Sequence, residues 1–173
     1  MSEIDLTDRH QKLLDYWRSL ISPGQAIPRR DAFDPTHIPH LLSFLILADL
    51  VDGEPIFRVV GTEMVDAWGS DFTGRPLSEF MSGDYHDFIR RLFDTCVEKQ
   101  APVFSHSRFQ WDRGRRLDTI RLMVPFARND DPDTVGHVLV GQSFDFTQAG
   151  PDRPEAAALT DGKFEEISLS VLK

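Results

Sequence analysis

The sequence predicts an α+β fold, in which a five-stranded antiparallel sheet carries helices on one face and follows an N-terminal amphipathic helix. Two groups of strand-like apolar runs predict the sheet, one within residues 44–60 and one within residues 103–144. The helical pattern of residues 84–100, which lies between these groups, predicts the layer that covers the sheet. With 173 residues and 40% hydrophobic content, the chain is long enough to bury one core without disulfides or metals.

The first element is an amphipathic helix that Thr7 or Asp8 can cap and that Pro23 ends. Its apolar residues recur at spacings of three and four, as one face of a helix requires. These residues, which are interface candidates, are Leu13, Leu14, Trp17, Leu20 and Ile21. Two readings of this stripe stay open: it packs on its own domain, or it meets a second copy of the chain in a homodimer.

The helix and an irregular connector occupy residues 5–43, and the connector contains Asp34-Pro35, a cap followed by a proline, which predicts a short helix. Residues 44–146 form the predicted sheet domain. Residues 147–173 are interpreted as a polar linker and a C-terminal tail. Apolar residues alternate within residues 163–172, which is consistent either with an added strand or with packing elsewhere.

The first two strands form a hairpin, because Asp52-Gly53 is a tight-turn signal between two apolar runs. Alternation places Phe57 and Val59 on one face of the second strand. Gly61 ends that strand and a short helix-like segment follows. Gly69 is expected just past the end of this segment, where a positive φ is needed.

Three strands follow the long helix, and their short loops predict an antiparallel meander. They are residues 103–111, 116–126 and 134–144. On the middle strand, alternation places Leu122 on the core face and Arg121 on the opposite face. We expect Arg121, like Arg58 and Arg108, to point into water, with a protein interface as the alternative.

Composition and charge argue against several classes of function. The formal net charge is −9 and the basic residues occur as scattered pairs, so binding to nucleic acid or to an anionic membrane surface is not expected. The longest apolar run, residues 44–48, is too short to span a membrane, and the polar N-terminus is unlike a signal peptide. The one cysteine excludes an internal disulfide, so we expect a cytoplasmic protein. We find no motif of a known enzyme class and expect no enzymatic activity.

Short motifs in a fixed order connect this chain with a known family. They are Trp17, residues 27–30 (IPRR), residues 33–35 (FDP), Leu47 with Asp49, residues 57–62 (FRVVGT), residues 69–77 and residues 121–125 (RLMVP). Through them the chain resembles a PAS-domain protein, and more narrowly the small single-PAS proteins common in alphaproteobacteria. The resemblance implies a sheet of order 2-1-5-4-3 that encloses a space for a small molecule or cofactor. It also implies dimerisation through a flanking helix, and a signalling protein partner or a homodimer is expected to carry the signal.

The residues present disfavour two cofactors of PAS domains. The flavin chemistry of the light-sensing class needs a cysteine in a G-x-N-C-R-F-L-Q motif, and the nearest equivalent, residues 72–80, contains none. Cys96 lies late on the long helix, at a position typical of a small buried hydrophobe. Haem is not expected, because His86, near the start of that helix, is interpreted as a surface or capping residue. His37 and His40 are separated by a proline and have no further ligands beside them, so no metal site is expected.

Aromatic and aliphatic side chains converge on a predicted cavity between the helices and the sheet. The candidates for its wall are Phe57, Val59, Met64, Trp68, Phe72, Phe80, Phe88, Leu92, Phe109, Trp111, Leu122, Val140 and Gln142. A plain packed core consists of the same residue types, so this alternative stays open. Gln142 stands out, because a buried amide needs a hydrogen-bond partner, which is either a ligand or a backbone group.

The sequence therefore predicts a cytoplasmic sensory or regulatory PAS protein that binds a small apolar or amphipathic ligand and signals through a partner or through dimerisation. The alternative is a protein-interaction or dimerisation module with a solid core and no ligand.

Overall fold

The computed structural model describes residues 6–111, 115–150 and 163–173 of the chain. Its helices are α1 (Asp8–Ser19), α2 (Thr62–Trp68), α3 (Leu77–Phe80) and α4 (Gly83–Lys99), and its short 3₁₀ helices are η1 (Arg30–Ala32), η2 (Pro35–His37) and η3 (Pro39–Phe44). Its strands are β1 (Leu45–Val51), β2 (Glu54–Val60), β3 (Val103–Trp111), β4 (Arg115–Ala127), β5 (Val135–Asp145) and β6 (Lys163–Val171). None of these helices in the described part of the chain is long and apolar enough to cross a bilayer.

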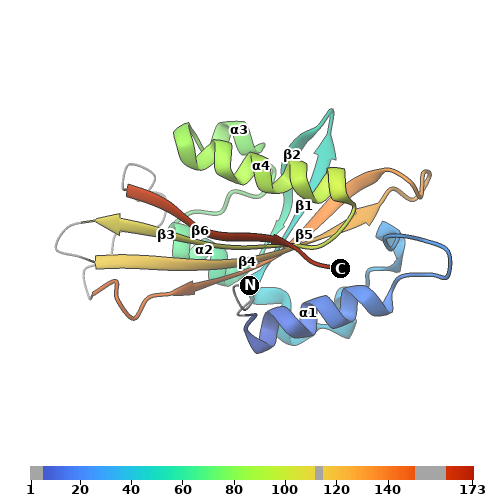
Figure 1. Ribbon diagram of the computed structural model, residues 1–173, viewed down its shortest axis with the longest axis horizontal. Helices are drawn as coiled ribbons and strands as arrows, with labels where there is room; N and C mark the ends of the chain where they lie inside the picture. Colours follow the sequence, from blue (N-terminus) through green and yellow to red (C-terminus); the bar gives the residue numbers. More distant parts are fainter. Residues whose placement is uncertain (1–5, 112–114, 151–162) are drawn as a thin grey trace.

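The strands of the described residues form one antiparallel sheet in the order β2-β1-β5-β4-β3-β6 (Figure 1). The first five positions confirm the predicted α+β fold and the sheet order 2-1-5-4-3. β6 pairs along β3, with Phe164 opposite Phe109 and Val171 opposite Val103. The alternating residues near the C-terminus therefore form an added sixth strand, which was one of the two readings that the sequence left open.

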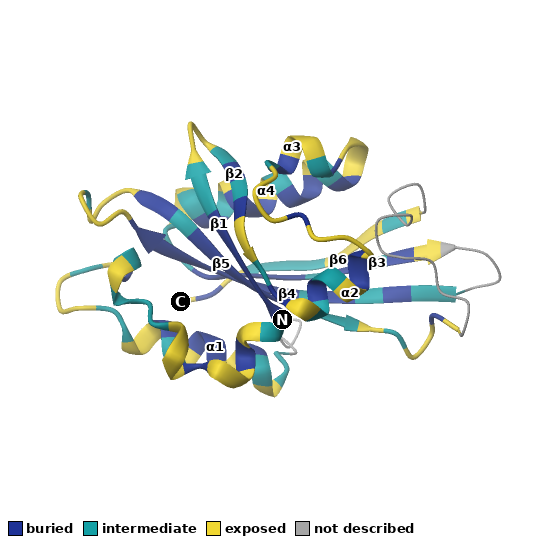
Figure 2. Cartoon of the chain, turned by 180° about the vertical axis from the view of Figure 1, so that it is seen from behind, coloured by how far each residue is buried: buried dark blue, intermediate teal, exposed yellow. Residues whose placement is uncertain are grey.

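Helices cover both faces of the sheet (Figure 1). α3 and α4 lie on one face, where Arg121 of β4 donates a hydrogen bond to the Tyr85 hydroxyl of α4. α1 lies on the opposite face, where the indole N–H of Trp17 donates to the carbonyl of Pro125 in β4 at 2.7 Å. The buried residues of α1 lie on its side toward the sheet (Figure 2). The two central strands β4 and β5 are consequently buried on both faces.

Several local sequence signals act as expected, although α1 ends at Ser19, before the Pro23 that was expected to end it. The Thr7 side chain caps α1 by accepting from the backbone N–H of His10, and Asp34 caps η2 in the same way. Asp52 and Gly53 have φ values of 50° and 79° and join β1 to β2, the conformation of a two-residue hairpin turn. Gly69 ends α2 with φ 76°, in the left-handed region that favours glycine.

A β-bulge in β2 makes the predicted direction of Val59 wrong. Leu47 lies opposite Val59 and Ala48 lies opposite Phe57, so Arg58 is an extra residue with no partner of its own in the register. The extra residue reverses the alternation, because it adds one step to a period of two. Phe57 is therefore buried at 3% exposure, whereas Val59 lies on the outer face and is 54% exposed.

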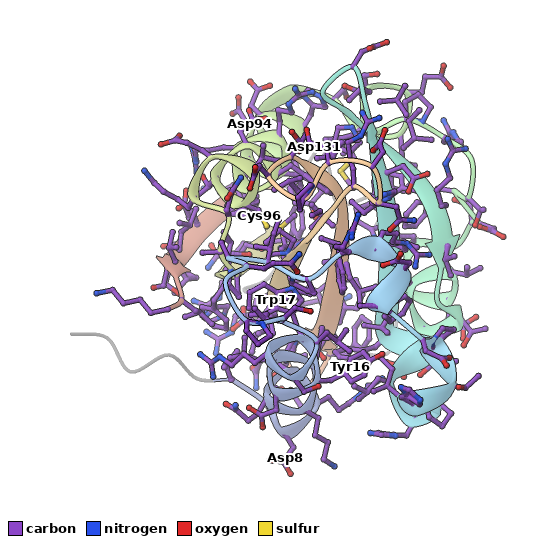
Figure 3. The ribbon with its side chains drawn as sticks, turned by 90° about the vertical axis from the view of Figure 1, so that its right-hand side faces the viewer. Asp8, Tyr16, Trp17, Asp94, Cys96 and Asp131 are labelled. Atoms are coloured by element: carbon purple, nitrogen blue, oxygen red, sulfur yellow. The ribbon has the colours of Figure 1, made fainter. Side chains whose placement is uncertain are left out.

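The apolar stripe of α1 packs on its own domain, which is one of the two readings that the sequence left open. Leu13, Leu14 and Trp17 are between 0% and 4% exposed within the single chain. Leu20 and Ile21 are half-buried and also pack against the core. Trp17 lies on the side of α1 that faces the sheet (Figure 3). Leu13, Leu14 and Trp17 therefore have almost no exposed area that could contact a second copy.

Replacing Gly61 with alanine is expected to lower the free energy of unfolding by about 2–3 kcal/mol. Gly61 has φ −64°, which any residue adopts, so the cost comes from space alone. An added Cβ would lie 2.6 Å from the carbonyl oxygen of Leu42 and closer still to that of Ser43. Both are backbone atoms of the segment leading into β1, which cannot rotate away as a side chain does. Urea denaturation measures the loss.

Gly74→Ala is the contrasting control for this prediction. Gly74 has open space around the added Cβ but a φ of 83°, so alanine there meets backbone strain without any clash. A loss at Gly61 no larger than the loss at Gly74 would contradict the close approach of η3 and the start of α2.

Candidate functional site

A small cavity lies inside the domain, between the sheet and the segment that runs from α2 to α4. Its volume is about 20 Å³, which is room for roughly one water molecule. It is lined by Ile46, Phe57, Trp68, Phe72, Met81, Tyr85, Ile89, Phe93, Arg121, Met123, Val140 and Gln142. β1, β2, α2, α4, β4 and β5 therefore all contribute to one cavity, with α4 on one side of it and β1, β4 and β5 on the other.

One wall of the cavity is aromatic. The ring of Phe57 in β2 makes an edge contact with Phe72 at 4.9 Å, and Trp68 of α2 makes another with Phe72 at 6.3 Å. Phe80 of α3 stacks on Phe72 from behind at 4.2 Å. These packed rings follow from the glycine-rich loop between α2 and α3, which brings Phe72 back over β2 through hydrogen bonds between Phe57 and residues 74–75. The wall offers an apolar ligand a large, rigid contact surface.

The opposite wall carries a buried positive charge. Arg121 of β4 is 2% exposed and lines the cavity. Its guanidinium donates to Ser107 Oγ at 2.9 Å and to the Tyr85 hydroxyl at 2.5 Å. Burial lowers the pKa of Arg121 and raises the pKa of Tyr85, because each ionised form loses its hydration. The pair therefore consists of a guanidinium cation and a neutral phenol.

Three further polar groups around Arg121 are buried without a hydrogen-bond partner among the described residues. They are Gln142 Nε2, Ser105 Oγ and Thr119 Oγ1. Gln142 and Ser105 lie directly opposite Arg121 on the two neighbouring strands, so all three share one face of the sheet. Buried polar groups in folded proteins are nearly always hydrogen-bonded. The polar groups on this face are therefore available to form hydrogen bonds with a ligand.

Five of the residues predicted for the cavity wall line it. They are Phe57, Trp68, Phe72, Val140 and Gln142. Five others belong to the surrounding core: Met64, Phe88, Leu92 and Phe109 are buried, and Phe80 is half-buried behind Phe72. The side chain of Trp111 lies outside the described residues.

Two of the predicted wall residues lie elsewhere. Val59 is on the outer face of β2, for the reason given above. Leu122 is buried, but it lies opposite Gly141, on the face where Leu13 of α1 packs. Alternation predicts that Leu122 faces the cavity and that Arg121 faces water. In the structure Arg121 faces the cavity and Leu122 faces α1, because helices cover both faces of the sheet and not one face as expected.

Several lining residues were missed by sequence reasoning. Arg121 was expected in solvent, and Ile46, Met81, Tyr85, Ile89, Phe93 and Met123 were not assigned to the wall. One signal was available: Val103, Ser105, Ser107 and Phe109 share one face of β3 by alternation, so two small residues lie between two apolar ones on that face. They fit a buried face that must leave room for a long side chain.

Cys96 and the histidines lie away from the cavity wall. Cys96 is fully buried on α4 (Figure 3), with Sγ 3.6 Å from the carbonyl of Ala101. Burial raises the pKa of its thiol, which therefore stays protonated at neutral pH. His86 contacts Asp87 at the start of α4. Among the described residues, no group of three His, Cys, Asp or Glu side chains could hold a metal ion.

Comparison with known proteins gives one family and several solved structures. A family model described as a PAS domain matches residues 7–139. The structure is similar to a sensory box sensor histidine kinase from Vibrio cholerae, with 18% identity over 64% of this chain and 87% of that chain and a TM-score of 0.45. It is similar to a LOV protein from Rhodobacter sphaeroides, with 16% identity over 73% of this chain and 74% of that chain and a TM-score of 0.46. A fungal LOV domain photoreceptor matches with 13% identity over 77% of this chain and 89% of that chain and a TM-score of 0.44. No curated protein matches the sequence.

Proposed function

The chain belongs to the PAS domain family, and we propose that it is a sensory domain that binds a small amphipathic molecule between α4 and the sheet. One observation carries this proposal: the cavity is lined by aromatic rings together with the buried guanidinium of Arg121 and the amide of Gln142, whose nitrogen has no partner among the described residues. An unpaired amide or hydroxyl destabilises a solid core, because it loses its hydration and gains no hydrogen bond. The signal passes to a protein partner or to a second copy of the chain.

The ligand must enlarge the cavity, because a volume of about 20 Å³ holds roughly one water molecule. The segment between α2 and α4 is suited to this movement. Gly69, Gly74 and Gly83 divide it at left-handed backbone positions, and Met81, which lines the cavity, is 9% exposed at its outer side. Displacing Met81 toward solvent opens the cavity without breaking the sheet. The same displacement moves the start of α4, and a protein partner that contacts this end of the helix would respond to the movement.

Analysis of the molecules that copurify with the chain tests the proposal. The freshly purified protein is denatured, and its supernatant is examined by mass spectrometry and by an absorption spectrum. We expect a colourless small molecule, because Cys96 and His86 both lie off the cavity wall and neither cysteine-linked flavin nor haem is proposed. A visible haem or flavin band would contradict this choice of ligand. An empty preparation that no small molecule stabilises against heat would contradict ligand binding itself.

A second candidate function, a protein-interaction module, is favoured by an apolar groove on the outer face of the sheet. The groove has a volume of about 240 Å³, and all of its lining residues except Arg30 are apolar: Phe33, Pro35, Leu42, Leu45, Leu47, Val59 and Leu139. Leu42 and Val59 at its rim are 40% and 54% exposed. α1 covers β4 and β5 but leaves this part of the face open. Exposed apolar surface of this kind is typical of interaction sites.

Replacing Val59 with lysine tests the second candidate. If the groove joins two copies of the chain, the variant is expected to be a monomer when the wild-type protein is a dimer, as measured by light scattering. The free energy of unfolding of the monomer should change by less than about 0.5 kcal/mol, since Val59 is mostly exposed.

Val51→Lys is the matched control for this test. Val51 is 43% exposed at the far end of β1 and does not line the groove, so its replacement should leave the mass unchanged. An unchanged dimer mass for Val59→Lys would exclude the groove as the dimer interface. Deleting residues 1–22 is a poor substitute, because it removes the buried residues of α1.

A further inference from the structure

The structure assigns a chemical class to the proposed ligand: we propose that the cavity binds a monocarboxylate with a short apolar tail, whose carboxylate lies against Arg121, Tyr85 and Gln142. This inference rests on the proposed function, because it requires a cavity that admits a ligand. It goes further by naming the charge of the ligand, the residues that bind it and the part of the ligand that each wall contacts.

The first argument is an unbalanced charge. Arg121 is 2% exposed, and a guanidinium remains protonated even when buried. Its hydrogen bonds go to two neutral hydroxyls, and the rings of Tyr85 and Phe88 lie 5.7 and 5.9 Å from its central carbon. No carboxylate within the part of the chain that the structure describes forms an ion pair with it. Hydroxyls and ring faces compensate only part of the lost hydration, so an anion is the missing partner.

The other arginines show what this chain does with exposed guanidinium groups. Arg58 pairs with Asp49 at 2.8 Å, and Arg108 pairs with Asp118 at 2.6 Å, although both arginines are far more accessible to water. Arg121 is therefore more deeply buried than these two arginines, yet no carboxylate pairs with it among the described residues. This contrast is opposite to what stability alone would favour, because a buried cation needs a counter-charge more than an exposed one does.

The second argument is the supply of free donors that converge on the same place. The Tyr85 oxygen accepts from Arg121, and since a guanidinium cannot accept, the phenol proton is available to another acceptor. Gln142 is 4% exposed, lines the cavity, and has an amide nitrogen without a partner. Arg121 itself uses two of its side-chain nitrogens in the bonds described. A carboxylate offers two oxygens with about four acceptor positions and matches donors of this number and kind.

The third argument is the polarity of the two walls. The cavity lining also includes Phe57, Trp68 and Phe72, which offer neither charge nor a free acceptor, and the ring of Trp68 lies 6.1 Å from that of Tyr85. A second carboxylate would have to lie among these rings, so a dicarboxylate is disfavoured. An inorganic anion would leave the aromatic wall without a partner. The ligand is consequently a carboxylic acid with an aromatic or short aliphatic tail.

Matched pairs of acids and amides test this inference on the full chain. The probes are phenylacetate with phenylacetamide, and hexanoate with hexanamide, measured by titration calorimetry and by thermal unfolding, with acetate as the tail-free comparison. We expect each acid to bind at least about tenfold tighter than its amide, because charge-assisted hydrogen bonds are stronger than neutral ones. The acids with tails should also bind tighter than acetate.

The outcomes separate this inference from the proposed function. If acid and amide bind equally, the cavity binds ligands but the anionic head group is wrong. If acetate binds as tightly as the longer acids, the apolar tail is wrong. If no probe binds and the protein copurifies with no small molecule, the proposed function fails and this inference fails with it.

Variants of Arg121 add an independent test. Arg121→Met is expected to bind phenylacetate and phenylacetamide equally, whereas Arg121→Lys keeps a positive charge and should retain a preference for the acid. Arg58→Met, on the outer face of β2, should leave the preference unchanged. If Arg121→Met does not fold, Gln142→Leu serves instead, with an expected loss of about three- to tenfold in affinity for the acid alone. An acid preference that survives in Arg121→Met, or an unaltered acid affinity in Gln142→Leu, would overturn the assignment.

Discussion

Replacing Trp17 with alanine is expected to lower the free energy of unfolding by about 4 kcal/mol. Trp17 is 4% exposed between α1 and the sheet, so its removal leaves a large hole that the neighbouring strands cannot fill. The change also removes the N–H donor that bonds the carbonyl of Pro125 at 2.7 Å. Urea denaturation followed by circular dichroism measures the loss.

Two further variants divide this effect into its parts. Trp17→Phe keeps most of the ring but lacks the donor, so its expected loss is about 1–2 kcal/mol. Lys12→Ala changes an exposed position on the same helix and is expected to stay within about 0.5 kcal/mol of the wild-type value. A small effect for Trp17→Ala, together with loss of self-association, would contradict the packing of α1 on its own sheet and restore the helix as a dimer interface.

Trp17 shows which part of the fold the sequence could predict and which part it could not. The spacing of apolar residues predicted the helix and its buried side, because both depend only on a period of 3.6 residues. The surface that buries this side is a tertiary property. A stripe facing the chain's own sheet and a stripe facing a second copy have the same sequence, so only the structure distinguishes them.

The residues of β4 show why half of the cavity was missed. Alternation predicts which residues share a face, and it grouped Leu122 with Val124 and Arg121 with Met123, as observed. Alternation identifies which face points into the core only when the other face is exposed to solvent. α1 and α4 cover opposite faces of this strand, so both groups are buried, and the hydrophobic group was assigned to the cavity by default. The polar group around Arg121 forms the wall instead.

Phe57 and Val59 show a different limit of sequence analysis. The hairpin between β1 and β2 was predicted from its turn residues, and its register at the turn follows from them. The bulge at Arg58 leaves no local sign, since Arg58 pairs with Asp49 as an ordinary cross-strand neighbour would. One inserted residue was enough to move Val59 from the predicted cavity to the outer groove.

Acidification from pH 7 to pH 5 is expected to lower the free energy of unfolding by about 2 kcal/mol through His10 alone. His10 is fully buried in α1. Its Nε2 lies 3.0 Å from the carbonyl oxygen of Gly141, which only accepts, so Nε2 carries the proton and Nδ1 accepts from the Thr7 hydroxyl at 2.7 Å. Burial lowers the pKa of His10 from 6.5 to about 4, and the charge of Arg9 acts in the same direction.

The direction of the pH effect on the free energy of unfolding depends on whether the folded or the unfolded chain binds the proton on His10 more tightly. Between the two pKa values the unfolded chain takes up a proton on His10 and the folded chain does not, so acid favours unfolding. The stabilisation is complete above pH 6.5 and is lost as the pH falls toward 4, by about 3 kcal/mol in total. Asp49, Glu63 and Asp118 also have lowered pKa values in the folded state, but their contributions are lost only as the pH falls below the ordinary range of a carboxyl group.

His10→Gln is the variant that isolates this effect, because its amide can still donate to the carbonyl of Gly141 but does not titrate. Urea denaturation of both proteins at pH 7, 6 and 5 should give a falling stability for the wild-type chain and a nearly constant one for the variant. Equal slopes for the two proteins would show that other groups carry the acid sensitivity. A wild-type stability that does not fall above pH 5 would mean that His10 is not held neutral where α1 meets the sheet.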